Sequence, residues 1–410
     1  MKIDRLLVAL ICVALAAAAI VFVSKRSPAS DEPAATIEVK GGDLSLLVVG
    51  VESLDLSIVE RLSDEGRLPN LTALMDAGAV GEFGTLGKGV DRKITWTSLV
   101  TGITPARQGI GGTKLSPRGD IVKAALVPNS RTVGTLWTAL AEAGRPVGVL
   151  GWWGSWPVEQ IDGIVVAPYQ TYFLERRHGG PPERQIYPLD LIEIVDPLVV
   201  DPEALSRKDL ARYVDTETAL GLEALIGQGY TDLANAHAAN VSMRDVAVTL
   251  ASSRELDAEL VLLPGIELVS QRFWHMANPD QMEWSTLSED VTEQVTAQIE
   301  ALGGVIDISY EVVDEILGDL LELTADGATV AVVSDHGYDG LRYDSRGQPM
   351  LGPNMYNEEG FWVLAGPAVR SGVRVRDLSL LDFAPTVAEA AGVVLVDEPD
   401  GRACAEMLLK

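Results

Sequence analysis

The sequence predicts an α/β fold, in which a doubly wound, mostly parallel β-sheet carries helices on both faces. Two observations lead to this prediction. Short, nearly continuous apolar runs recur along the chain, as in strands that are buried on both faces of a parallel sheet. Longer segments that mix apolar and charged residues, as surface helices do, separate these runs. Alternation of the two kinds of segment is typical of a layered α/β domain.

The predicted strands are Leu44–Val51, Val147–Leu150, Leu260–Leu263, Thr329–Val333 and Phe361–Ala365. The predicted helices are Ile58–Ala77, Val133–Ala143, Met243–Ser253 and Thr292–Leu323. With 410 residues, of which 47% are hydrophobic, the chain can bury a large core. We therefore predict one large folded domain over residues 44–410.

Residues 163–245 interrupt this alternation. They contain the loop-like sequence His178-Gly-Gly-Pro-Pro182, which is followed by a polar sequence of helical character from Pro202 to Met243. We predict that this segment forms an inserted cap subdomain over one edge of the sheet.

Residues 1–24 are predicted to be a membrane anchor. Leu6–Val23 is an uninterrupted apolar stretch with basic residues on both sides, and it is about long enough to span a bilayer as a helix. A cleaved signal peptide has a shorter apolar core followed by a small-x-small site, so retention is favoured. Residues 25–43 are rich in Ser, Pro, Ala and charge and are predicted to be a linker. The predicted location is the cell membrane, with a single pass and the main domain outside the cytoplasm.

The charge of the chain restricts its partners. A net charge of −27 and a pI near 4.5 argue against nucleic acid as a partner, because such a surface repels phosphates. An anionic ligand would therefore need local positive charge at its site. The two cysteines, Cys12 and Cys404, provide neither a disulfide framework nor a cysteine-based metal site.

Acidic residues and one histidine follow three of the predicted strands. Glu52 comes after the first strand, Glu267 after Leu260–Leu263, and Asp335-His336 after Thr329–Val333. Because ligands bind beyond the carboxyl ends of strands in open α/β sheets, these residues are candidate metal ligands. Acidic residues at such positions can instead cap the following helices. Their convergence favours a present or former ligand cluster.

Seven ordered motifs resemble the type I phosphodiesterase/nucleotide pyrophosphatase family of the alkaline phosphatase superfamily. They are Val48-Val-Gly-Val51, Leu68-Pro-Asn-Leu71, Trp96-Thr-Ser-Leu-Val-Thr-Gly102, Gly151-Trp-Trp-Gly-Ser-Trp-Pro157, Ser270-Gln-Arg-Phe-Trp274, Val333-Ser-Asp-His-Gly337 and Asp382-Phe-Ala-Pro-Thr386. The resemblance extends from about Leu44 to Leu408. It implies an alkaline-phosphatase-like fold and a two-zinc hydrolase, in which a Thr or Ser attacks phosphorus and forms a covalent intermediate.

The resemblance places the nucleophile at Arg92 and the first metal-binding aspartate at Glu52. The family's His-Gly-Ile sequence, which follows the nucleophile helix, corresponds to Gln108-Gly-Ile110 in this chain. Arginine cannot attack phosphorus and stays positively charged. Glutamate keeps the carboxylate of aspartate but moves it outward by one methylene, which alters the distance to a zinc ion.

The other ligand positions implied by the resemblance are Glu267, Gln271, Asp335, His336 and Tyr356. Only Asp335 and His336 retain the family's residues. Glutamine is a poor zinc ligand compared with neutral imidazole, so zinc, the cofactor expected for the family, is predicted to bind weakly or not at all.

A guanidinium at the nucleophile position can take over the role of the missing cation. Arg92 is expected to lie close to Glu52 and Asp335 and to neutralise these carboxylates through a bidentate pair. The substitutions therefore favour a pseudoenzyme with a binding or scaffold role and a phosphate-containing ligand.

The alternative is an active metal-dependent phosphodiesterase or phosphatase with a rearranged site. In this interpretation Glu52, Asp335 and His336 hold one metal ion with an open position for an attacking water. A third interpretation is a purely structural component of the cell envelope.

Several other side chains are weaker candidates. Thr95, Thr97 and Ser98 are possible substitutes for the nucleophile, although such hydroxyls usually cap and pack a helix. His275 lies four residues after Gln271 and is more typical of an interface or surface histidine. The tryptophans Trp152, Trp153 and Trp156 follow a strand and are interpreted as core residues, with the lining of a substrate cleft as the alternative.

Overall fold

The structure is a computed structural model. It describes residues 42–87, 90–110, 113–115, 121–123, 131–171, 179–214, 216–279, 289–338 and 356–409. All of these lie in the compact unit formed by residues 40–410. The predicted anchor and most of the predicted linker lie outside the described residues. Within the described residues, no helix combines the length and the apolar character needed to cross a membrane.

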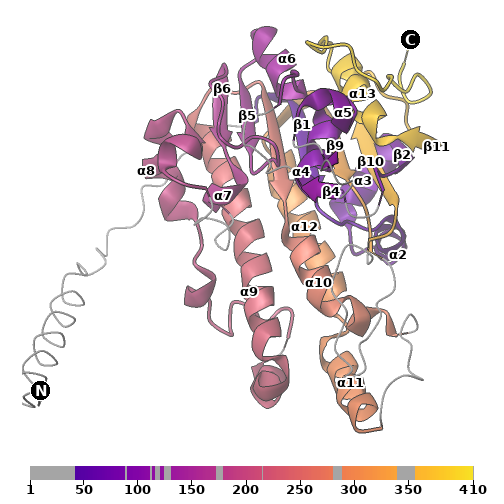
Figure 1. The fold of residues 1–410 in the computed structure, drawn as a ribbon. Helices are drawn as coiled ribbons and strands as arrows, with labels where there is room; N and C mark the ends of the chain where they lie inside the picture. The colour runs from indigo at the N-terminus through magenta and orange to yellow at the C-terminus, as the bar shows by residue number, and fades with distance from the viewer. Residues whose placement is uncertain are drawn as a thin grey trace, which may run out of the picture. The chain divides into compact units, whose positions relative to one another are not determined.

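Nine strands of the described chain form the main sheet (Figure 1). Side by side they are β11 (Val373–Ser379), β2 (Ala79–Gly84), β10 (Glu359–Ala365), β9 (Thr324–Ser334), β1 (Leu44–Val51), β8 (Ala258–Leu263), β5 (Val147–Leu150), β6 (Gly163–Val166) and β7 (Ile186–Tyr187). The short strands β3 (Thr113–Leu115) and β4 (Ile121–Lys123) pair separately. All five predicted strands are present, and β1 and β5 have the predicted bounds.

The sheet is mostly parallel, as predicted. β9, β1, β8, β5 and β6 run in parallel, and β2 is parallel to β11. β10 is antiparallel to both β9 and β2, and β7 is antiparallel to β6. The interpretation of Phe361–Ala365 as a parallel strand is therefore wrong. The antiparallel bridge between Tyr338 and Tyr356 already brings the chain back alongside β9 before β10 begins.

The helices are α2 (Leu56–Asp64), α3 (Pro69–Ala77), α4 (Arg92–Thr101), α5 (Pro105–Gln108), α6 (Leu136–Glu142), α7 (Pro168–Thr171), α8 (Ile192–Val195), α9 (Thr216–Ser253), α10 (Gly265–Ala277), α11 (Glu289–Leu302), α12 (Val305–Leu321) and α13 (Phe383–Ala390). Short 3₁₀ turns connect several of them: η2 (Pro182–Arg184), η3 (Leu189–Leu191), η4 (Asp196–Leu198), η5 (Pro202–Ala204) and η9 (Leu380–Asp382).

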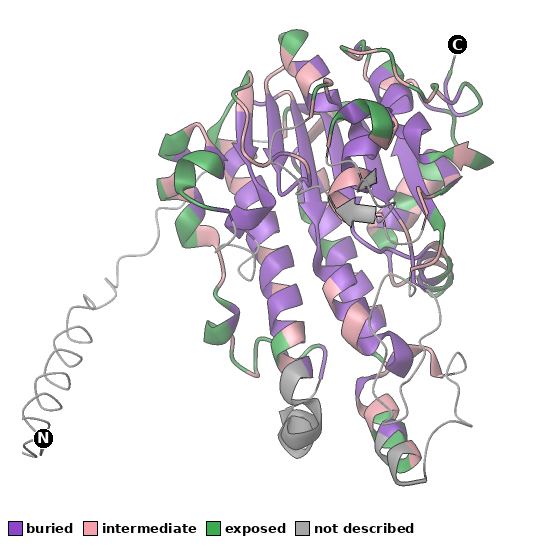
Figure 2. Cartoon of the chain, viewed as in Figure 1, coloured by how far each residue is buried: buried purple, intermediate pink, exposed green. Residues whose placement is uncertain are grey.

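Both faces of the sheet are covered, which confirms the doubly wound architecture. Along β1, Leu47, Val49 and Val51 belong to one hydrophobic core, whereas Leu46 and Val48 belong to the other. Helices α2, α3, α9, α10 and α12 contribute to the first core, and α4, α6 and α13 contribute to the second. The central strands are consequently buried along most of their length (Figure 2), as their continuous apolar text requires.

Two of the predicted helices are each divided. Ile58–Ala77 separates into α2 and α3, because Gly66 adopts a φ of +71° and Pro69 suits only the first turn of a new helix. Thr292–Leu323 separates into α11 and α12 at Gly303 and Gly304. Glycine is the weakest helix former after proline.

The predicted start of the cap subdomain is wrong. Gly163–Val166 and Ile186–Tyr187 are strands of the main sheet, at its β7 edge. The later part of the segment belongs to α9, which packs against β5, β8, α10 and α12. Strands at the edge of a sheet are short and need no long apolar run. These two strands therefore could not be distinguished by sequence from the polar segment that follows them.

A glutamate lies inside the core, away from any charged partner. Glu259 of β8 is fully buried, and neither of its carboxylate oxygens accepts a hydrogen bond from the described part of the chain. It faces Gly148 of β5, where a side chain would collide with it. Burial raises the pKa of Glu259 to about 8, because an apolar surrounding disfavours the charged form.

This pKa predicts a pH-dependent stability. Between about pH 5 and pH 8 the unfolded chain releases the Glu259 proton but the folded chain keeps it, so the free energy of unfolding falls as pH rises. We expect Glu259→Gln to gain stability relative to wild type by about 1.4 kcal/mol per pH unit across this window, with no further gain above pH 8.

Urea unfolding at pH 5, 6.5, 8 and 9 measures this difference. Glu255→Gln is the matched control, since Glu255 is four residues earlier and exposed. A stability difference between Glu259→Gln and wild type that stays constant with pH would contradict the prediction.

Candidate functional site

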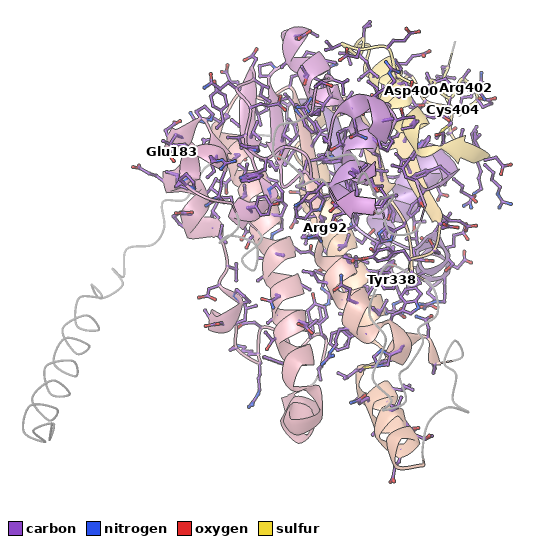
Figure 3. All side chains as sticks on the ribbon, viewed as in Figure 1. Arg92, Glu183, Tyr338, Asp400, Arg402 and Cys404 are labelled. Carbon is purple, nitrogen blue, oxygen red and sulfur yellow. The ribbon has the colours of Figure 1, made fainter. Side chains whose placement is uncertain are left out.

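The predicted site residues surround one cavity of about 330 Å³ at the carboxyl end of the central strands. Its walls include all seven positions implied by the family resemblance, together with Thr95, Lys93, Trp153 and Asn357. Figure 3 shows one of them, Arg92, at the beginning of α4. The topology explains the gathering, because β1, β8 and β9 are adjacent and parallel.

Glu52 continues β1 into the cavity wall. Its backbone N–H still donates to Leu263 of β8, at 3.0 Å, and its side chain is only 2% exposed. Oε1 accepts a 2.6 Å hydrogen bond from Trp153 Nε1, whereas Oε2 has no partner within the described residues. Burial raises the pKa of Glu52 to about 8, against the opposing effect of the Arg92 guanidinium. Burial therefore favours the neutral form of this carboxyl group.

Asp335 and His336 directly follow β9. Asp335 is 2% exposed, and its Oδ1 accepts no hydrogen bond in the described structure. Burial raises the pKa of Asp335. Its Oδ2 lies 3.7 Å from His336 Nε2, and the other ring nitrogen, Nδ1, lies 3.0 Å from the carbonyl oxygen of Gly337. Burial opposes protonation of His336, but the carboxylates of Asp335 and Glu267 raise its pKa above the ordinary value.

Glu267 is enclosed by hydrogen-bond donors. Oε1 accepts 2.6 Å and 2.8 Å hydrogen bonds from Gln271 Nε2 and the Tyr356 hydroxyl, and Oε2 accepts one from the Ser53 hydroxyl. Tyr356 also stacks on the imidazole of His336, with ring centroids 4.0 Å apart. Two of the family's ligand positions, Gln271 and Tyr356, thus donate to a third one instead of facing a metal ion.

Arg92 is the first residue of α4, whose N-cap is Asp91. Its guanidinium lies over the indole of Trp153, with Cζ 4.2 Å from the ring centroid. The expected bidentate pair is not formed with Glu52 or Asp335, since Glu52 Oε2 and Asp335 Oδ1 accept no hydrogen bond from described residues. Trp153, which already donates to Glu52, offers its ring face to the guanidinium and so orients it.

The three residues considered as substitute nucleophiles, Thr95, Thr97 and Ser98, have different surroundings. Thr95 lines the cavity. Thr97 Oγ1 donates to the carbonyl oxygen of Lys93 at 2.6 Å, and Ser98 Oγ accepts from Gln108 Nε2 at 2.7 Å. Thr97 and Ser98 thus have the structural role expected of hydroxyls in a helix.

His275 also falls outside the cavity. Its side chain is buried, and burial with the nearby Arg272 lowers its pKa to about 4.

The donor set does not fit two zinc ions. Glu267 already accepts three hydrogen bonds, while glutamine and tyrosine stand where zinc prefers imidazole. Among the described residues, no group of three or more His, Cys, Asp or Glu side chains is arranged to hold a metal ion. The unpartnered oxygens of Glu52 and Asp335 are the remaining atoms suited to a cation.

Sequence reasoning missed Lys93 and Asn357 of the cavity wall, and it also missed the contacts of Ser53 and Trp153. Ser53 completes the enclosure of Glu267, and it adopts a left-handed φ of +63° in the turn between β1 and α2. Trp153 is buried, as a core residue should be, but its indole nitrogen reaches Glu52. The sequence gives no signal for either contact, apart from the position of Trp153 directly after a strand.

The nine-stranded, mostly parallel sheet with helices on both faces defines the class first, a doubly wound α/β fold with a cluster of carboxyl groups at the carboxyl edge of its central strands. The chain belongs to the type I phosphodiesterase/nucleotide pyrophosphatase family, whose model matches residues 46–374. The resemblance described above is thereby confirmed, as is the fold.

Solved structures of similar fold include three with low sequence identity. A 2-O GAG sulfatase is 14% identical, with a TM-score of 0.48, over 89% of this chain and 74% of the other. The phosphonate monoester hydrolase of Agrobacterium radiobacter is 13% identical, with a TM-score of 0.44, over 90% and 77%. Human ectonucleotide pyrophosphatase/phosphodiesterase 5 is 11% identical, with a TM-score of 0.42, over 87% and 97%. The comparison with curated proteins finds no match.

The role of Ser53 predicts a difference between two substitutions. Both Ser53→Ala and Ser53→Gly remove the hydrogen bond to Glu267, but only glycine adopts a positive φ without strain. We expect Ser53→Ala to be less stable than Ser53→Gly by about 1 kcal/mol, and both to be less stable than wild type. Urea unfolding at one pH measures the order, and equal stability of the two variants would contradict it.

Proposed function

We propose that this protein is a membrane-anchored, extracytoplasmic member of its family that binds a phosphate-containing ligand and whose two-zinc hydrolysis is lost or strongly impaired. The observation that carries the proposal is the enclosure of Glu267 by Ser53, Gln271 and Tyr356. A metal ion at this carboxylate would have to displace donors that already satisfy both of its oxygens.

The positive charge of Arg92 also supports the proposal that two-zinc hydrolysis is lost or strongly impaired. Arg92 lowers the pKa of Glu52 through its charge, so it acts on that carboxyl group in the same direction as a metal cation would. A guanidinium in this position also repels a divalent cation, and it cannot serve as a nucleophile. Arginine binds phosphate well, because its fork of N–H donors matches the phosphate oxygens.

The cavity provides the local positive charge that an acidic protein needs for an anionic ligand. Arg92, Lys93 and His336 all line it, and the charge of the neighbouring carboxylates favours the protonated form of His336. Burial favours the neutral form of Glu52, which reduces its repulsion of an anion. The anchoring part of the proposal is supported by the apolar stretch Leu6–Val23.

A second candidate function is hydrolysis with a single metal ion. It is favoured by the buried, unpartnered oxygens Glu52 Oε2 and Asp335 Oδ1, because buried carboxylates are normally paired or bound to a cation. Glu52, Asp335 and His336 would hold the ion, which would supply an activated water at neutral pH. His336 would have to release its proton to act as a ligand.

Zinc content separates the two candidates. We expect purified wild-type protein to retain almost no zinc after mild dialysis, because Glu267 is enclosed and Arg92 carries a positive charge. The variant Arg92→Thr/Gln271→His/Tyr356→His restores the family's nucleophile type and two imidazole ligands, so we expect it to bind about one zinc ion or more per chain. Elemental mass spectrometry measures both values.

Arg92→Thr alone is the control, because it leaves Gln271 and Tyr356 in place and should stay zinc-free. Stoichiometric zinc in the wild type would support the second candidate instead. Its further requirement is zinc-dependent release of nitrophenol from a model diester, with loss of the activity in Asp335→Ala.

Phosphate binding tests the proposal directly. We expect inorganic phosphate to raise the Tm of the wild type, because a ligand that binds only the folded state stabilises it. Arg92→Met should weaken phosphate binding about tenfold or more, since a charge-assisted hydrogen bond contributes about 1.5–3 kcal/mol. Thermal unfolding over a phosphate titration, at constant ionic strength, gives the affinities. Arg376→Met, which removes an exposed arginine of β11, should have no effect. No shift of Tm with phosphate in the wild type would reject the proposal.

A further inference from the structure

We infer that the anion site extends from the cavity to Arg184, and that the ligand is a small molecule with a phosphate group and a second, separate anionic group. This inference rests on the proposed function, because the phosphate group occupies the cavity at Arg92 and Lys93. Arg184, in the turn η2, then binds the second anionic group.

A row of three aromatic rings leads from the cavity to Arg184. Trp153, in the cavity wall, is edge-on to Tyr169, with ring centroids 6.0 Å apart. Tyr169 is in turn edge-on to Trp156, at 5.1 Å. The Arg184 guanidinium lies over Trp156, with Cζ 4.6 Å from the ring centroid. The rings therefore connect the two cationic positions without interruption.

Each cation along this row is held by a ring face. Arg92 lies over Trp153, and the Lys93 ammonium lies 5.8 Å from the Trp153 ring and 5.6 Å from the Tyr169 ring. An aromatic face attracts a cation through its ring electrons, and at Lys93 and Arg184 it leaves the N–H donors available for an anion. Lys93, Arg92 and Arg184 are thereby oriented in advance, which reduces the entropy lost when a ligand binds.

The platform beneath Arg184 is itself fixed. Trp156 Nε1 donates a 2.8 Å hydrogen bond to the carbonyl oxygen of Gly179. The neighbouring Gln185 donates through Nε2 to the carbonyl oxygen of Gly180 at 2.5 Å, and its own side chain is buried. A Cβ at Gly179 would lie 2.4 Å from the Gln185 side chain, so the segment is closely packed. Arg184 itself is exposed and accessible to a ligand.

Lys93 and Arg184 differ from most other cationic side chains in the described part of the chain in their pairing with carboxylates. Arginines such as Arg61, Arg67, Arg145 and Arg212 each lie within 4 Å of a carboxylate. Neither Lys93 nor Arg184 has such a partner among the described residues. In a chain of net charge −27, two cations that no carboxylate compensates, both on one aromatic row next to a cavity, favour an anionic ligand.

Linear bis-anions test the inference on the full-length protein. The probes are inorganic phosphate and α,ω-alkane bisphosphonates of increasing chain length, titrated by calorimetry at constant ionic strength. We expect one length to bind at least about tenfold more tightly than inorganic phosphate, because the second group is captured intramolecularly. Arg184→Met keeps the side-chain stem but removes the charge, and should abolish this gain while changing phosphate affinity less than about twofold.

Arg402→Met is the matched control. Arg402 is also exposed, and Figure 3 shows it at the β11 side of the domain, whereas Glu183, next to Arg184, lies at the β7 side. It should leave every probe unaffected. Phosphate binding without a tighter bis-anion, or a tighter bis-anion that Arg184→Met does not weaken, would overturn this inference alone. A wild type that binds no phosphate would overturn the proposed function as well.

Discussion

The burial of three carboxyl groups at one edge of a parallel sheet is the constraint on which the rest of the site depends. Glu52, Glu267 and Asp335 are each 4% exposed or less, and a buried carboxylate is costly unless protons, hydrogen bonds or cations compensate it. The fold produces this situation, because adjacent parallel strands end at the same edge. The three groups are not all compensated in the same way, and this difference bears on what the cavity can bind.

Glu267 is compensated by neutral donors, whereas Glu52 and Asp335 depend on protons and nearby positive charge. Three hydrogen bonds satisfy the two carboxylate oxygens of Glu267 without adding net charge. Glu52 has one donor, Trp153, and the nearby charge of Arg92, and its pKa is raised by burial nevertheless. Gln271 and Tyr356 stand at positions where the family has metal ligands, and both donate hydrogen bonds to Glu267. A metal ion at Glu267 would make these donors unnecessary, so their presence is consistent with the loss of that ion.

The sequence predicts the centre of the fold better than its edges. β1 and β5 are found with their predicted bounds because buried parallel strands require continuous apolar text. β2 and β11 were missed: β2 is short and contains two glycines, and β11 alternates exposed and partly buried positions. For the site, the family resemblance points to seven positions, and all seven line one cavity. It could not predict that Ser53 donates to Glu267 or that Trp153 connects Glu52 with Arg92, because these contacts join residues that are far apart in the sequence.

The cavity therefore consists of two halves that differ in their capacity to bind a ligand. One half, formed by Ser53, Glu267, Gln271 and Tyr356, satisfies its own polar atoms, and so it acts as a rigid wall. The other half, formed by Glu52, Asp335 and the cations near them, retains carboxylate oxygens that have no partner among the described residues. Binding must concentrate in this second half, since a ligand gains little from atoms that are already hydrogen-bonded. The row of rings that begins at Trp153 starts in the same half. In the proposed binding mode, a ligand that enters this half meets Arg92 and Lys93 first, and its remaining length extends toward Arg184, over the cations that the row of rings supports.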